Sequence, residues 1–223
     1  RNIQKQKVSF ISIIVIALLG VSVLLALDYS AAGLTRNGSN FFNAQQGCDI
    51  EAVSTLLFSP QDLAEMRSLE GVTDVETVWQ VGARASSGAD REDVNVISLT
   101  ERMNLPVLRE GRLPETPTEC AVEKVLADKM GLCVGSDLIL QNAAGETVQY
   151  LLNDRYTIVG IADHPDHGYT ILDDTWYVLV TPAAFDREEL DGCFMKAEVA
   201  VAKSVDADRF SDAYKASVAA VQA

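Results

Sequence analysis

Residues 8–27 read VSFISIIVIALLGVSVLLAL, a run of 20 residues that contains no charged side chain. A helix of about 20 apolar residues is long enough to cross the hydrocarbon core of a bilayer. Two lysines lie just before the run and Asp28 follows it. Since positively charged flanks stay on the cytoplasmic side, we expect residues 1–27 to form a cytoplasmic stub and a transmembrane helix of the cell membrane, with residues 28–223 on the extracytoplasmic side.

Two other interpretations of this segment stay open. A cleaved signal peptide would have its basic start in residues 1–7 and small residues for cleavage at 30–32, but its apolar region is usually about 7–15 residues long. A buried core helix is seldom apolar on every face. The length of the run therefore favours a retained membrane anchor. Because residue 1 is not Met, we also expect the chain to be part of a longer protein.

Composition separates this segment from the rest of the chain. Apolar residues make up 48% of the 223 residues and charged residues 22%, which is typical of a globular protein and excludes wholesale disorder. The net charge is −14, although residues 1–27 contain basic residues and no acidic one. The extracytoplasmic part is therefore strongly acidic. We expect no nucleic-acid partner, because phosphate binding needs clustered cations.

The first part beyond the membrane segment shows alternating strand and helix signals. A polar stretch interrupted by glycines, residues 28–47, is expected to lead out of the membrane. Ser59, Pro60 and Asp62 have the spacing of a capping box with proline at the first helical position, which predicts the start of a helix. The other expected elements are strands over residues 50–58, 72–81 and 94–99 and a hairpin turn at 86–90.

A boundary follows at residues 109–114 (REGRLP), beyond which short strands and hairpin turns predominate. We predict a small β-rich subdomain over residues 109–165, inserted into an α/β subdomain that residues 28–108 begin and residues 166–223 complete. The fold class is then α+β. The elements expected here are strands over residues 120–122, 138–140, 148–152, 156–161, 176–180 and 196–202, and helices over 123–130 and 207–221, the last of them amphipathic.

Five short motifs follow one another along this outer part. They are EGRLP at residues 110–114, ECAV at 119–122, a helix and glycine turn over 126–137, YTIVGI at 156–161, and YVLVTP at 177–182 with Phe185. Behind a membrane helix of this orientation, their order resembles the extracytoplasmic (periplasmic core) domain of the FtsX-like, MacB-type ABC transporter permease family. The resemblance covers nearly the whole chain, from the first transmembrane helix onward.

The resemblance implies a porter-like α/β subdomain that carries the β-rich insert. It also implies a permease subunit rather than an enzyme, one that forms a dimer with a second permease copy or homologue and works with a separate cytoplasmic ABC ATPase subunit. Motion driven by ATP would pass to the outer domain, a role termed mechanotransmission, and would drive export of a substrate or activation of an extracellular partner. Membrane lipid is the remaining partner, and no cofactor is implied. The chain lacks the phosphate-binding loop GxxxxGK[ST], so we do not expect it to hydrolyse ATP itself.

The residues of these motifs are expected to be architectural. Glycine suits turns and helix ends that need a positive φ, and Arg112 could bind a carboxylate or a carbonyl group where the inserted subdomain begins. The structural motif residues are Gly111, Arg112, Pro114, Glu119, Gly131, Gly135, Asp137 and Gly160.

The two histidines, His164 and His167, lie three residues apart with aspartates at nearby positions. Imidazole and carboxylate groups can hold Zn²⁺ or another divalent ion. Two histidines do not complete a zinc site, however, and Pro165 and Gly168 are typical of a solvated turn. We therefore predict no metal site, with these two histidines as the residues to check.

The four cysteines all follow the membrane segment, in a compartment where disulfides form. The preferred disulfides are Cys48–Cys193 and Cys120–Cys133. Each cysteine of the first pair precedes a strand of the α/β part, and both cysteines of the second pair lie in the insert. Free buried thiols are the alternative, because a sequence does not place sulfur atoms within bonding distance.

Two further classes of function stay open. A membrane sensor such as a histidine kinase would also place a ligand-binding domain after one helix. A secreted enzyme would be released by signal cleavage, although the sequence contains no nucleophile elbow and no recognisable Ser–His–Asp set. Several apolar spans after residue 223 would favour the permease, whereas one span followed by a kinase signature would favour the sensor.

Overall fold

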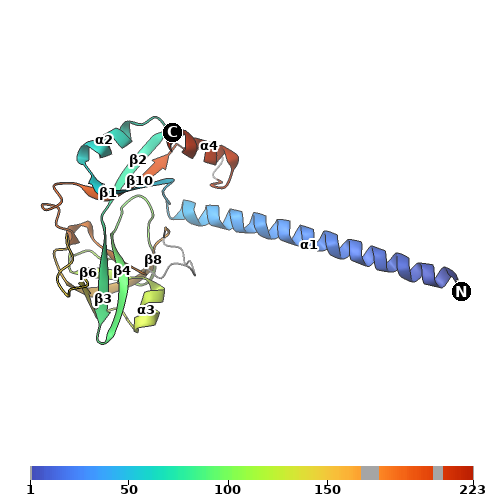
Figure 1. The fold of residues 1–223 in the computed structure, drawn as a ribbon, viewed down its shortest axis with the longest axis horizontal. Coiled ribbons are helices and arrows are strands. Elements are labelled where there is room, and N and C mark those ends of the chain that lie inside the picture. The colour runs from blue at the N-terminus through green and yellow to red at the C-terminus, as the bar shows by residue number, and fades with distance from the viewer. Residues whose placement is uncertain (1, 167–175, 203–207, 223) are drawn as a thin grey trace.

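The computed structural model describes residues 2–166, 176–202 and 208–222 of the chain (Figure 1). One long helix, α1 (Asn2–Ala44), projects from a body that contains two β-sheets and the remaining helices. The structure is thus an apolar N-terminal helix followed by a mixed domain of helices and strands, which confirms the α+β class.

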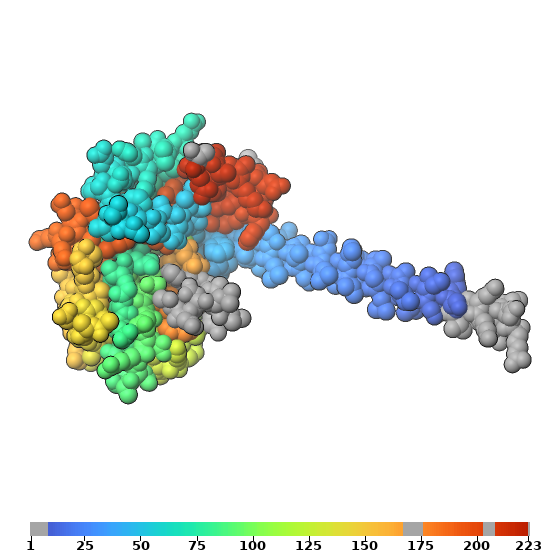
Figure 2. Space-filling view, viewed as in Figure 1, coloured from blue at the N-terminus to red at the C-terminus, as the bar shows by residue number. Residues whose placement is uncertain are grey.

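Helix α1 contains the segment that was predicted to cross the membrane. Among the described residues it is the one helix long and apolar enough to do so, with a mean hydropathy of 3.0 in its apolar stretch, and none of that stretch is buried. The interpretation as a buried core helix is therefore wrong. Figure 2 shows the blue part of α1 standing clear of the body.

The helix is longer than expected, because it continues without a break to Ala44. The prediction that residues 28–47 leave the membrane as a glycine-interrupted stretch is wrong up to that point. A glycine costs only about 1 kcal/mol in a helix interior. Gly38 also has a packing role here, since a Cβ at this position would lie 3.1 Å from the ring of Phe210.

The smaller sheet has three antiparallel strands in the order β1-β10-β2. The strands are β1 (Ile50–Phe58), β2 (Val72–Val78) and β10 (Phe194–Val201). Helix α2 (Pro60–Ser68) contacts β1 and β2, and helix α4 (Asp212–Gln222) contacts β10. The start of α2 is the predicted capping box, in which the side chains of Ser59 and Asp62 each bind the other residue's backbone N–H group.

The larger sheet has seven strands in the order β5-β8-β6-β9-β4-β3-β7. Because β7 also pairs with β8, six of these strands close on themselves as a small barrel, and β5 extends the pairing of β8. The strands are β3 (Gln80–Ser87), β4 (Asp90–Ser98), β5 (Val107–Gly111), β6 (Glu119–Val122), β7 (Asp137–Gln141), β8 (Arg155–Asp163) and β9 (Trp176–Val180). Helix α3 (Lys124–Met130) and a 3-10 turn, η1 (Pro182–Ala184), complete the described elements.

One expected strand is wrong, because residues 148–152 form a turn with isolated bridges. Val148 and Leu151 of this segment are nevertheless buried and pack in the core. The segment does not pair with β7, because both edges of β7 are already paired, with β3 and β8. The last helix begins at Asp212 rather than at residue 207, and residue 207 lies outside the described residues.

The barrel draws strands from all three ranges into which the extracytoplasmic part was divided. Strand β3 precedes residue 109 and β9 follows residue 165, yet they pair with β7 and β6 of the predicted insert. Strand β4 lies between β9 and β3 and completes the barrel. The two sheets also share one core, in which Phe194 of β10 packs in the same cluster as Tyr156 of the barrel. The subdomain boundaries stay a prediction, whereas the shared core makes the body one packed unit.

Candidate functional site

Two of the predicted motif residues, Gly111 and Gly160, lie where β5 pairs with β8 and are partners in register. A Cβ on Gly111 would lie 2.2 Å from the carbonyl oxygen of Val159. A Cβ on Gly160 would lie 2.1 Å from the carbonyl oxygen of Arg112. The two backbones are therefore in direct contact, which only glycine allows.

Arg112 and Glu119 form a two-pronged ion pair just beyond this crossing, with Nη1–Oε2 and Nη2–Oε1 distances of 2.9 and 2.5 Å. Glu119 also accepts the backbone N–H groups of Glu115 and Thr116. Arg112, together with these N–H groups, lowers the pKa of Glu119 to about 2. Glu119 thereby closes the turn that contains the buried Pro114.

The remaining motif residues lie elsewhere on the barrel. Gly131 and Gly135 have left-handed φ values of 65° and 94°, and Gly131 is the C-cap of α3. Asp137 pairs with Arg155 at 3.5 Å on the surface. The contacts described for the motif residues thus shape turns and strand crossings within the barrel.

The histidine segment does not assemble a metal centre in the described part of the chain. His164 is buried, and its backbone N–H group donates to the hydroxyl of Tyr177 at 2.7 Å. Its Nδ1 accepts the backbone N–H group of Asp166 at 3.3 Å. His167 lies outside the described residues. Among those that are described, no group of three or more histidine, cysteine, aspartate or glutamate side chains could hold a metal ion.

All four cysteines are free thiols, so neither preferred disulfide is formed in the structure. Cys120 is fully buried on β6, whereas Cys133 is exposed after α3, so shared membership of the insert did not bring them face to face. Burial raises the pKa of the Cys120 thiol far above its usual range, and burial with nearby carboxylates raises the pKa of Cys48 to about 12. Both thiols therefore stay protonated at neutral pH.

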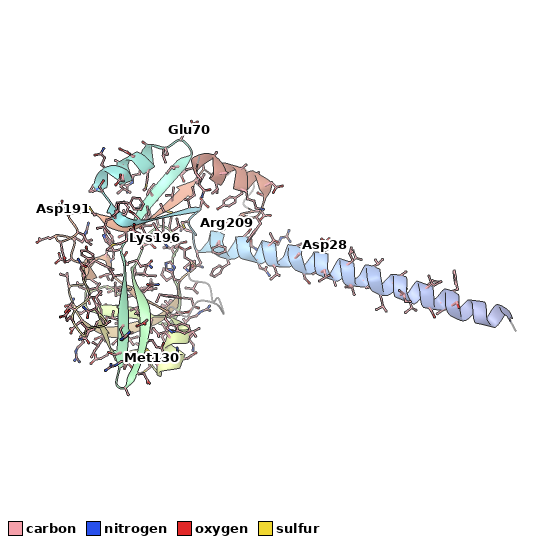
Figure 3. All side chains as sticks on the ribbon, in the orientation of Figure 1. Asp28, Glu70, Met130, Asp191, Lys196 and Arg209 are labelled. Atoms are coloured by element: carbon pink, nitrogen blue, oxygen red, sulfur yellow. The ribbon has the colours of Figure 1, made fainter. Side chains whose placement is uncertain are left out.

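A site that the sequence analysis did not identify lies where α1 meets the body (Figure 3). Its centre is Arg209, in the segment before α4, whose side chain is 9% exposed. The guanidinium group donates to the side chain of Asn43 at 3.2 Å and to the carbonyl oxygens of Gly47 and Cys48. It also pairs with Asp49 at 3.2 Å. One buried arginine therefore binds both the end of α1 and the turn that follows it.

Asp49 connects this turn to the small sheet and to α4. Its side chain is 1% exposed, and it accepts hydrogen bonds from the Tyr214 hydroxyl at 2.6 Å and from the backbone N–H group of Val201 at 2.8 Å. Burial and the bond to Asp49 raise the pKa of Tyr214 above its usual range, so the hydroxyl remains a donor.

Helix α1 is bound at a second level by Ser39. Its hydroxyl donates to Asp208 at 2.8 Å and accepts the backbone N–H group of Arg209 at 3.1 Å. We use the term joint for the contacts of α1 and its following turn with the C-terminal segment. The residues of the joint are Ser39, Asn43, Asp49, Asp208, Arg209 and Tyr214.

A second buried polar cluster lies on one face of the small sheet. The strand register aligns Glu51, Glu198 and Glu76 across the three strands. The side chain of Lys196, labelled in Figure 3, is 4% exposed. Its ammonium group lies 2.9, 3.3 and 3.6 Å from carboxylate oxygens of Glu51, Asp166 and Glu198.

The loop over residues 99–106 connects this cluster to α1. Backbone N–H groups of its middle residues donate to the Glu76 carboxylate at 2.7, 3.1 and 3.0 Å. The next two N–H groups, the first of which belongs to Asn104, donate to the carbonyl oxygens of Gln46 and Gln45 at 3.1 and 2.9 Å. One loop therefore binds both the glutamate cluster and the two residues that directly follow α1.

These contacts attach α1 to several parts of the body. Removing one partner of a buried ion pair leaves an uncompensated charge and costs about 3–5 kcal/mol, so the Arg209–Asp49 pair is expected to be a strong contact of the joint. No sequence motif indicated it, because Cys48 and Arg209 are separated by 161 positions. The one signal in the sequence was the position of Arg209, a basic residue just before the C-terminal amphipathic helix in a strongly acidic part of the chain.

Comparison with known proteins gives structural matches only, because no family model and no curated protein matches the chain. One solved structure is the extracellular domain of the noncanonic ABC-type transporter YknZ from Gram-positive bacteria, with 11% identity and a TM-score of 0.43 over 72% of this chain and 80% of that one. Another is the periplasmic region of MacB from Actinobacillus actinomycetemcomitans, with 11% identity and a TM-score of 0.43 over 78% and 74%. A third is a domain of a protein named as a permease from Porphyromonas gingivalis, with 17% identity and a TM-score of 0.45 over 64% and 67%.

All three are transporter or permease domains. This is the class of protein that the sequence motifs resemble. The proposed function rests on the sequence motifs and on the joint.

Proposed function

We propose that this chain contains the first transmembrane helix and the extracytoplasmic domain of an ABC transporter permease subunit. It would couple ATP-driven motion in the cytoplasm to export of a substrate or to activation of an extracellular partner. In this role it pairs with a second permease copy or homologue and is driven by a cytoplasmic ABC ATPase subunit. Residues 28–108 and 166–223 would form the porter-like subdomain, and residues 109–165 the inserted β-rich part.

The observation that carries the proposal is that α1 is one continuous rod from the apolar segment to the buried joint. Helix beyond residue 27 extends for roughly 25 Å, at about 1.5 Å per residue. A domain that only binds a ligand needs no such stiffness, because a flexible linker would tether it equally well. A rod with a buried anchor instead transfers tilt or rotation of the membrane helix to the body.

The joint would pass such a movement to several parts of the body at once. Arg209 precedes α4, while Asp49 precedes β1 and binds the end of β10 through Val201. The core shared by the two sheets then moves the barrel with the small sheet. ATP binding on the cytoplasmic side would favour one outer arrangement over another, which is a population shift.

Stiffness of the rod can be tested at Gly33, where an added Cβ would meet nothing within 4 Å. Gly33→Pro breaks the helix between the membrane and the joint. Gly33→Ala is the matched control, because it keeps the helix and adds about 1 kcal/mol of helix propensity. In the full-length protein, extracted with its natural partners, a label at the hairpin tip (Gly88) reports the distance between two outer domains with and without ATP.

We expect an ABC ATPase subunit to co-purify with all three proteins. The ATP-dependent change in distance should occur in the wild type and in Gly33→Ala and be lost in Gly33→Pro. Absence of an ATPase subunit from every preparation would contradict the permease, and a co-purifying kinase activity would identify a sensor. An ATP response that survives in Gly33→Pro would contradict the mechanical role of the rod.

A further inference from the structure

Three glutamates stand in one cross-strand row of the small sheet. Glu198 of β10 pairs in register with Glu51 of β1 on one side and with Glu76 of β2 on the other. Like charges directly opposite one another destabilise a sheet. This repulsion is strongest at the centre of the row, because Glu198 has a glutamate on each side and is only 1% exposed.

Neighbouring groups compensate the two outer glutamates but not the central one. Glu76 accepts three backbone N–H groups of the loop 99–106, and Glu51 lies 2.9 Å from the ammonium group of Lys196. In the described part of the chain, neither carboxylate oxygen of Glu198 has a hydrogen-bond partner. The Lys196 nitrogen lies 3.6 Å away and is shared with two other carboxylates.

Burial and the groups around Glu198 act on its pKa in opposite directions. Burial has the largest effect and raises the pKa of Glu198 to about 7. Asp166 and Glu76 add to the increase through their negative charge, whereas Lys196 and the Asn104 amide oppose it. Lys196 and Asn104 therefore reduce the effect of burial on the pKa of Glu198 but do not cancel it.

Asn104 links this buried group to the end of α1. Its side chain is fully buried and lies close enough to lower the pKa of Glu198, although not in hydrogen-bonding geometry. Its Oδ1 accepts the backbone N–H group of Cys48 at 2.9 Å, and its own backbone N–H group donates to Gln46 at 3.1 Å. The Cys48 thiol also faces the cluster but stays protonated, because burial raises its pKa to about 12.

We propose that Glu198 is a protonation switch that controls how firmly the loop 99–106 holds the end of α1. With a proton on Glu198, the row carries one charge fewer and the loop stays closed. Loss of the proton leaves a buried anion without a donor, which is unfavourable unless the loop opens and admits water. The pH on the extracytoplasmic side would then set the stiffness of the attachment between membrane helix and body.

The direction of the effect follows from the two protonation equilibria. With the loop closed the pKa of Glu198 is about 7, and with the loop open it returns toward the ordinary value of 4.5. The closed loop therefore binds more protons. The stabilisation of the closed loop by the bound proton is complete below about pH 4.5, decreases as the pH rises to about 7, and is absent above that. The equilibrium constant for loop opening changes by at most roughly tenfold per pH unit.

Hydrogen exchange of the backbone N–H groups at residues 101–105 measures this opening in the full chain in detergent micelles. After correction for the intrinsic exchange rate, we expect protection in the wild type to decrease at least tenfold between pH 5 and pH 7.5. Glu198→Gln is neutral at every pH and should keep the protection seen at low pH. If Glu198→Gln does not fold, a carbon-13 NMR titration of the Glu198 carboxyl group in the wild-type protein measures its pKa directly. A pKa below about 5.5 would overturn the proposal.

Glu123 offers a matched control, because burial raises its pKa to about 7 as well, but it is the residue before α3 on the barrel. Glu123→Gln should leave the pH response of the loop unchanged. Glu76→Gln weakens the acceptor of three loop N–H groups and should lower their protection at every pH. The same pH response in the wild type and in Glu198→Gln, or no response in the wild type, would overturn the proposal. The test needs no ATPase subunit, so its outcome is independent of the proposed function.

Discussion

The chain contains two arginine–carboxylate pairs of opposite character. Arg112 and Glu119 lie on the barrel with side chains 48% and 15% exposed, within a motif that is recognisable in the sequence. Arg209 and Asp49 lie at the joint with side chains 9% and 1% exposed, and no motif indicates them. Exposed pairs contribute little, whereas breaking a buried pair leaves a charge without partner or water. In this protein the most recognisable residues shape the barrel, whereas the pair expected to have the larger effect on stability attaches the body to α1.

The largest effect is expected from Arg209→Met, which leaves the carboxylate of Asp49 buried without its cation. The free energy of unfolding should decrease by about 3–5 kcal/mol. Urea unfolding of the full chain in micelles, followed by the fluorescence of the two tryptophans, measures this. Arg209→Met combined with Asp49→Leu removes both charges and should recover much of the loss. A cost below about 1 kcal/mol for the single variant would remove the contrast between the two pairs.

An intermediate effect is expected at the strand crossing beside Arg112. Gly160→Ala places a Cβ 2.1 Å from a backbone oxygen, a clash that no side-chain rotation relieves. The expected cost is about 1–3 kcal/mol in the same unfolding experiment. Gly82→Ala is the matched control on β3, because its Cβ would meet nothing within 4 Å, and it should change stability by less than about 1 kcal/mol. Equal effects of the two substitutions would show that the crossing does not require glycine.

The smallest effect is expected from Glu119→Gln, and it should depend on pH. Arg112 and two backbone N–H groups lower the pKa of Glu119 from 4.5 to about 2. A carboxylate with a lowered pKa stabilises the folded state above its ordinary pKa, and this contribution is lost as the pH falls from about 4.5 to about 2. Thermal unfolding across this range should therefore show a steeper decrease in Tm for the wild type than for the variant. A decrease in the free energy of unfolding at neutral pH as large as that of Arg209→Met would contradict the ranking of the two pairs.

Elements with short-range signals were predicted well. The start of α2 depends on Ser59 and Asp62, and the end of α3 depends on Gly131, so each signal lies within one turn of the chain. The C-terminal end of α1 was predicted wrongly, because Gly38 in the sequence indicates an interruption of the helix. Only the structure shows that the ring of Phe210 packs against this glycine. The segment 148–152 was given the wrong structure because its apolar residues fit a strand, although its possible partners were already paired.

Composition and periodicity along the chain were enough to establish an apolar helix, an acidic folded body, and strands and helices in nearly the right order, because each depends on neighbours close in sequence. Folding in three dimensions decided the closure of the barrel through β7 and β8, the row around Glu198, and the pairing of Arg209 with Asp49. Distant segments meet only in the folded chain. The strength of a buried charge pair depends on how completely those segments exclude water, and that exclusion has no counterpart in any local pattern of residues.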